Sequence, residues 1–79
     1  MNIELIGDAE LTALASNAFD LGLRHGRVPG IPATSEWVCV HLGIPHSPLI
    51  YVASLNATYR AGYDIGAMQR RFKEAQDRL

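Results

Sequence analysis

Phe19-Asp-Leu-Gly22-Leu-Arg-His-Gly26 and Tyr59-Arg-Ala-Gly62-Tyr-Asp-Ile-Gly66 are two copies of one pattern, an aromatic residue followed by glycines three and seven positions later. Both copies lie in segments with helical periodicity, where each glycine costs roughly 0.5–1 kcal/mol relative to alanine. Glycines four residues apart share one face of a helix and allow a second backbone to come close. We therefore expect a crossing of two helices at four glycines: Gly22, Gly26, Gly62 and Gly66.

The first copy of the pattern belongs to a helix expected over residues 8–26. Asp8 is a candidate N-cap, and apolar residues follow it at spacings of three and four. Gly26 suits the left-handed position that ends many helices. The run Val28-Pro-Gly-Ile-Pro32 cannot continue the helix because proline lacks an amide donor. The chain is expected to leave the helix as an extended connector.

A short helix is expected over residues 35–42. Thr34 can cap its start, and Gly43 followed by Pro45 is a stop signal. The alternative is a strand, because the segment Trp37-Val-Cys-Val40 has high β-propensity. A strand there would have no second strand to pair with, which favours the helix.

The second copy of the pattern lies in a long helix expected over residues 47–78. Ser47 is a capping residue, and Pro48 fits the first helical position, where its missing donor costs nothing. One apolar seam is expected along this helix, formed by Tyr51, Leu55, Thr58, Gly62, Ile65, Phe72 and Leu79. At 1.5 Å per residue the long helix would extend past the first one. We therefore expect its uncovered end to form a homodimer.

These elements predict an all-α fold, a helical hairpin of two glycine-bearing helices joined by the short one. The 79 residues are expected to form a single domain, with residues 1–7 as an extended arm. Cys39 is the single cysteine, and no secretory leader is evident, so a cytoplasmic location is expected. No run of residues is long and apolar enough to span a membrane.

The net charge is −1, but the charged residues are distributed unevenly between the two halves of the chain. Residues 1–47 carry five acidic residues and two arginines, whereas residues 48–79 carry three acidic residues and five basic ones. Cations near the end of a helix complement its dipole, which explains the asymmetry without any ligand. A nucleic-acid footprint would be denser in positive charge, so nucleic-acid binding is not favoured.

Motifs typical of enzymes or of metal sites are weak in this chain. Cys39, His41 and His46 are residue types that bind zinc, but their spacing matches no common structural zinc site. A nucleophilic pair of Cys39 with either histidine is the alternative. The sequence has no phosphate-binding loop and no nucleophile elbow. We expect a protein that is not an enzyme and has no metal or cofactor.

The residues most suited to contact a partner lie on the long helix. Tyr59 and Tyr63 are four residues apart and would share one face with the glycines. Core packing is one role for them, and an aromatic hot spot for a partner is the other, since tyrosine and arginine are enriched at such sites. The basic residues that would accompany them are Arg60, Arg70, Arg71 and Lys73.

Two parts of the chain, about 18–27 and 56–66, resemble ribosome modulation factor and similar small phage and plasmid proteins. The resemblance rests on the spacing of Ala18, Gly22 and Gly26 and on that of Tyr59, Gly62, Tyr63 and Gly66. That family pairs two short glycine-bearing helices. This chain is longer, is acidic overall and has tyrosine where the family often has tryptophan. The resemblance implies a small accessory protein of mobile-element origin that binds something larger.

The function expected from the sequence is that of an interaction protein that inhibits or modulates a larger host protein. The first alternative is a ribosome-binding or nucleic-acid-binding module that uses the basic residues of the long helix. The second alternative is an oligomer that sequesters a small nucleotide, with tyrosines stacking on the base and arginines holding the phosphates.

Overall fold

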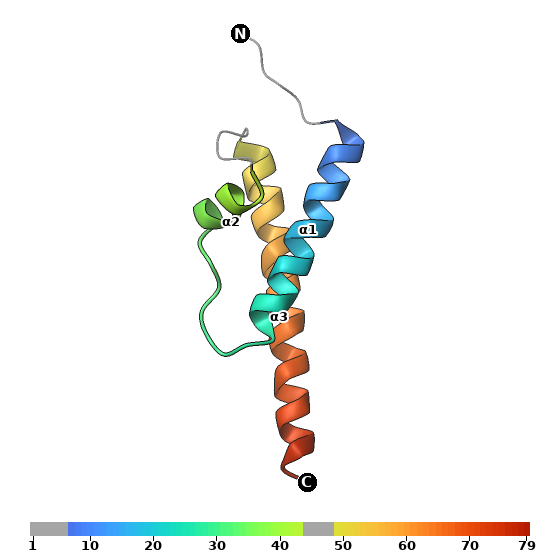
Figure 1. Ribbon diagram of the computed structural model, residues 1–79, viewed down its shortest axis with the longest axis vertical. Coiled ribbons are helices and arrows are strands. Elements are labelled where there is room, and N and C mark those ends of the chain that lie inside the picture. The colour runs from blue at the N-terminus through green and yellow to red at the C-terminus, as the bar shows by residue number, and fades with distance from the viewer. Residues whose placement is uncertain (1–6, 44–48) are drawn as a thin grey trace.

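The computed structural model describes residues 7–43 and 49–79, which form three helices (Figure 1). Helix α1 spans Asp8–Gly26, α2 spans Ser35–His41 and α3 spans Leu49–Asp77. The predicted all-α class is confirmed, and residues 37–40 form a helix rather than a strand. The expected N-terminal arm, except Gly7, and the expected start of the last helix at Ser47 lie outside the described residues.

Helix α1 spans the predicted residues, but its N-cap lies one residue earlier than expected. Its N-cap is Gly7, in an extended conformation, so the prediction of Asp8 as the cap is wrong. Asp8 and Glu10 lie in the first turn, where their negative charge complements the helix dipole. The Thr12 hydroxyl donates a hydrogen bond to the Asp8 carbonyl oxygen at 2.8 Å.

The chain turns back after α1 through residues 27–43, which we call the return limb. Gly26 is helical and has no positive φ, so its predicted left-handed stop is wrong, and Arg27 caps the helix instead. Thr34 caps α2 as predicted, because its side chain accepts a hydrogen bond from the Trp37 amide at 3.2 Å. Gly43 follows α2 with φ of 80°, a left-handed conformation that glycine adopts without strain.

Helices α1 and α3 lie side by side and run in the same direction (Figure 1). Gly22 faces the backbone of Tyr59, and Gly26 faces that of Tyr63, so the residue numbers of the two helices increase in the same direction along the contact. A hairpin has antiparallel helices, and the predicted hairpin is therefore wrong in direction. The return limb carries the chain back toward the start of α1 before α3 begins, which makes the parallel arrangement possible (Figure 1).

The glycines of the two helices bring the backbones into direct contact. A Cβ added to Gly22 would meet the Tyr59 carbonyl oxygen and would lie 2.8 Å from the Tyr63 nitrogen. The relation is reciprocal, since a Cβ added to Gly62 would meet the Phe19 carbonyl oxygen. Gly26 and Gly66 repeat this geometry one turn further along. A Cα hydrogen of each glycine therefore faces a carbonyl oxygen, a weak but favourable contact between helices.

A small core forms beside this contact, between the second half of α1, the first half of α3 and α2. Its buried members are Ala18, Leu21, Val38, Leu55 and Tyr59. The molecule measures 60 × 22 × 15 Å and has a radius of gyration of 14.7 Å. A compact chain of this length would have a radius of about 12 Å. The excess arises because the second half of α3 projects beyond the end of α1 (Figure 1).

The apolar seam predicted along α3 is covered by the other helices near its start and uncovered toward its end. Leu55 and Gly62 are buried against the other helices, whereas Phe72 and Leu79 are exposed. An α-helix has 3.6 residues per turn, so positions that follow a seven-residue repeat rotate by about 20° per repeat, away from the face that packs against α1.

Candidate functional site

Tyr59, for which core packing and contact with a partner were the two alternatives, is fully buried and belongs to the core. Its hydroxyl accepts a hydrogen bond from the Ala33 amide at 3.0 Å and lies 2.6 Å from Nδ1 of His25. Since the hydroxyl keeps its own proton, it can donate to that nitrogen while it accepts from the amide. Tyr59 therefore joins α1, the return limb and α3 at one point.

Tyr63 is half-buried and makes a second tie to the return limb. Its hydroxyl donates a hydrogen bond to the Gly30 carbonyl oxygen at 2.7 Å. Its ring lies 6.4 Å from that of Tyr59, measured between centroids, at a tilt of 43°. The two tyrosines therefore hold the return limb against α3.

Three further rings, those of His25, Trp37 and His41, form a series of contacts that begins at Tyr59. The Trp37 and His41 rings are stacked, 4.9 Å apart and 11° from parallel. His25 lies 5.4 Å from Trp37 and meets the Tyr59 ring edge-on at 5.5 Å. Trp37 is thus held between two histidines while 44% of its surface stays exposed. A large ring held in this way loses little conformational entropy when it binds a partner.

The large exposed apolar side chains of the described residues fall into two sets. Four lie on the return limb, and we call them the limb surface: Val28, Ile31, Trp37 and Val40. Ile31 is 91% exposed, which is unusual for isoleucine in a folded chain. The other four lie on α3: Ile65, Met68, Phe72 and Leu79. We call these four, together with Ala61 and Ala75, the tail seam.

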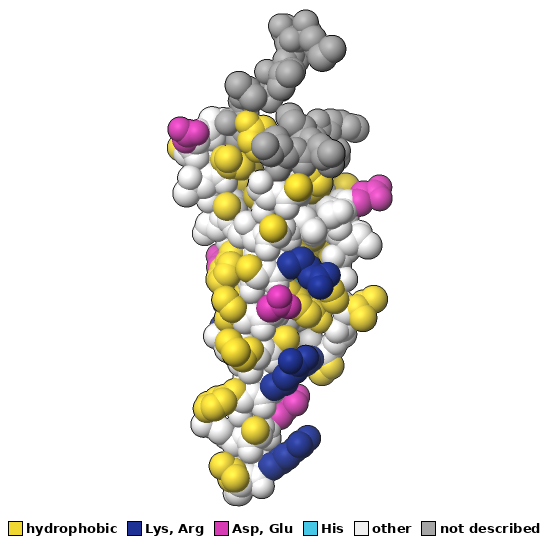
Figure 2. All heavy atoms as spheres, turned by 180° about the vertical axis from the view of Figure 1, so that it is seen from behind, with side chains coloured by type: hydrophobic (Ala, Val, Ile, Leu, Met, Phe, Trp, Pro, Cys, Tyr) yellow, Lys and Arg dark blue, Asp and Glu magenta, His cyan; other side chains and the backbone are white. Residues whose placement is uncertain are grey.

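The tail seam lies on the side of α3 that faces away from α1 (Figure 2). Its members recur at alternating spacings of four and three residues from Ala61 to Leu79. This repeat keeps them in one column along the helix. Figure 2 shows apolar side chains running down one edge of the lower half of the molecule, beside a column of charged side chains. The arrangement is typical of a helix that pairs with another helix.

The basic residues expected to contact a partner do not form one surface. Arg60, Arg71 and Lys73 are exposed, whereas Arg70 is half-buried, and its buried Nε has no hydrogen-bond partner among the described residues. Acidic side chains alternate with basic ones along the visible face of α3 (Figure 2). A phosphate backbone would meet both signs of charge on that face, which weakens the case for nucleic-acid binding there.

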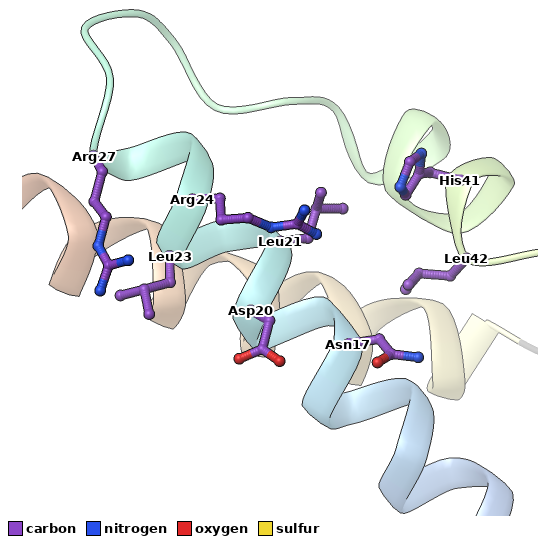
Figure 3. A pocket seen from close by; sticks show the side chains of 8 residues that line it. All are labelled: Asn17, Asp20, Leu21, Leu23, Arg24, Arg27, His41 and Leu42. Atoms are coloured by element: carbon purple, nitrogen blue, oxygen red, sulfur yellow. The ribbon is translucent and has the colours of Figure 1, made fainter.

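A hollow of about 510 Å³ lies between α1 and the end of α2 (Figure 3). Its polar lining combines Arg24, Arg27 and His41 with Asn17 and Asp20, and leucines complete the wall. Nε of Arg27 donates a hydrogen bond to the Gln69 side chain at 3.1 Å, which turns that arginine toward α3. No tyrosine is among the eight lining residues, so the arginines and tyrosines expected to hold a nucleotide do not meet here.

Cys39 is buried, and burial raises the pKa of its thiol above the ordinary value of 9.0. The thiolate, which is the form that attacks substrates and binds metals, is therefore disfavoured at neutral pH. His41 is exposed, and His46 lies outside the described residues. Within residues 7–43 and 49–79 no three residues of metal-binding type come together. None of the three helices has a stretch apolar and long enough to traverse a lipid bilayer.

Comparisons with known proteins give no relative of this chain. No protein-family model matches it, and no curated protein and no solved structure does so either. The resemblance to ribosome modulation factor therefore stays a prediction that depends on two short motifs.

Proposed function

We propose that this protein is a non-enzymatic interaction protein that binds a larger host protein through the limb surface and inhibits or modulates it. The observation that carries the proposal is Trp37, a large ring that is half exposed yet held between His25 and His41. Tryptophan is among the residues most enriched at the energetic centre of interfaces. The two motifs that resemble those of small phage and plasmid proteins support an origin in a mobile element.

The surroundings of Trp37 support this role. Val40 lies one turn further along α2 and is exposed, so both side chains are on the same side of that helix. Tyr59 and Tyr63 fix the return limb to the two long helices through hydrogen bonds to Ala33 and Gly30. A surface that is fixed before binding loses less conformational entropy on association than a loose loop does.

Affinity capture from a nuclease-treated bacterial lysate tests the proposal with two matched variants. Val40→Glu places a charge on the limb surface, and Met68→Glu places the same charge on the tail seam. Both residues are exposed, 59% and 60%, so both variants should fold. We expect Val40→Glu to lose the captured protein and Met68→Glu to keep it. Equal capture by Val40→Glu and the unmodified chain would contradict the proposal.

The nucleic-acid alternative makes a different prediction in the same experiment. Binding to phosphates weakens steeply as the salt concentration rises and disappears after nuclease treatment. Contacts made by Trp37 and Val40 are apolar and should persist at high salt. Capture that depends on intact nucleic acid would favour the alternative and would point to the basic residues of α3.

A further inference from the structure

The tail seam is an apolar helix face that no described part of the chain covers. Gly66 contacts the backbone of Arg27 just after α1 ends, so α1 does not reach the last three turns of α3. Phe72 is 66% exposed and Leu79 is fully exposed. Apolar side chains at this spacing are stabilised when a second helix packs against them.

We propose that the tail seam binds the tail seam of a second copy of this chain, with the two α3 helices antiparallel. In this pairing Ile65 packs against Met68 of the second copy, and Phe72 packs against Ala61. A large side chain then meets a small one at each end of the contact, which fills the space between the helices. The proposal concerns a surface separate from the limb surface and does not depend on its partner.

The charges beside the seam select the antiparallel orientation. Asp64, Arg71 and Arg78 follow one edge of the seam at intervals of seven residues, and Gln69 and Gln76 follow the other. In a parallel pair one edge faces the other, so Asp64 and Arg71 would both meet glutamines. In the antiparallel pair each edge faces the same edge of the second chain. With Ile65 opposite Met68, Asp64 then lies opposite Arg71, and the symmetry gives this pair twice.

Sedimentation equilibrium tests whether the seam pairs at all. The seam is short, so we expect a reversible dimer that forms as the concentration rises. Phe72→Glu should weaken dimerisation by about tenfold or more, because it places a charge in the apolar contact. Lys73→Glu adds the same side chain outside the seam and should leave the dimer unchanged. Both variants should keep the helical circular dichroism of the unmodified chain. A chain that stays monomeric at the concentrations used for NMR would overturn the proposal.

Cysteine cross-linking tests the orientation, in the Cys39→Ala background so that only introduced thiols react. A mixture of chains carrying Ile65→Cys and Met68→Cys should form a disulfide-linked dimer, because these positions meet in the antiparallel pair. Chains carrying Ile65→Cys alone should not, because each residue 65 lies opposite a residue 68. Efficient cross-linking by Ile65→Cys alone would show a parallel pair, and cross-linking of Met68→Cys with Phe72→Cys chains would show a different register. Either result would overturn the proposal.

A charge exchange supplies an independent check of the register. Asp64→Arg should weaken the dimer, because it places two arginines opposite each other. Adding Arg71→Asp to the same chain should restore it with the signs reversed. Failure of the double variant to recover would contradict the pairing of these two residues.

Discussion

At the scale of single residues, four glycines let two helical backbones touch. Each would cost stability in an isolated helix, and each has a carbonyl oxygen of the other helix where a Cβ would be. The spacing of the glycines predicted a close helix crossing, because glycines four residues apart leave one face of a helix without side chains, and a second helix can approach that face closely. The direction of the second helix could not be predicted, because the same bare faces fit together in either direction.

Gly22→Ala tests this contact. The new methyl group would overlap the Tyr59 carbonyl oxygen, and neither backbone can move without separating the helices. We expect a loss of about 2 kcal/mol or more, even though alanine favours the helix by about 1 kcal/mol. The melting temperature should then fall by about 10 °C or more.

Gly7→Ser is the matched control, because nothing lies within 4 Å of a Cβ at Gly7. Serine is also preferred at the N-cap position, so the control should keep or raise the melting temperature. Thermal unfolding followed by circular dichroism measures both variants. Equal melting temperatures for Gly22→Ala and the unmodified chain would refute the close contact.

Cys39 gives a prediction about pH at the same scale. Burial raises the pKa of its thiol, so the folded state holds that proton more tightly than the unfolded state does. The stabilisation is complete below the unfolded pKa and is lost as the pH rises through about 9 toward the folded pKa. The difference in unfolding free energy between the unmodified chain and Cys39→Ala should therefore shrink above about pH 9. A difference independent of pH would contradict the burial of the thiol.

At the scale of elements, the return limb is held by two tyrosine hydroxyls on α3. Each hydroxyl bonds a backbone group of the limb, at Ala33 and Gly30. The sequence predicted the limits of α1 and α2 well, because caps and prolines act locally. It left core packing and partner contact as alternatives for Tyr59, because burial depends on the path of the limb and on contacts far apart in the chain.

Tyr59→Phe tests the more buried of these two ties. It removes the partner of the Ala33 amide and of His25 Nδ1 and should cost about 1–3 kcal/mol, because the amide is left unpaired. Tyr63→Phe is the control, since its bond to Gly30 is exposed and should cost about 1 kcal/mol. Hydrogen exchange at the Ala33 amide should accelerate in Tyr59→Phe more than in Tyr63→Phe. Equal acceleration in the two variants would show that Tyr59 has no special role in holding the limb.

At the scale of the whole molecule, the large apolar side chains that stay exposed in the described part of the chain belong to two sets, the limb surface and the tail seam. The sequence pointed to the long helix as the binding element, because its aromatic and basic residues are close in sequence. The structure buries Tyr59 and leaves Trp37 exposed on the return limb. The sequence could not show which of the two rings is buried, since both occur in helical segments with apolar neighbours. The burial of each ring depends on how the return limb packs.

The parallel contact of α1 and α3 at the glycines is the basis of the whole account, and NMR can observe it directly. Nuclear Overhauser effects should join the Gly22 Hα protons to the Tyr63 amide and the Gly66 Hα protons to the Arg27 amide. Both should disappear in Gly22→Ala if that variant separates the helices. Effects that instead join Gly22 to residues near Ala67, and Gly26 to residues near Tyr59, would show antiparallel helices and would contradict the account.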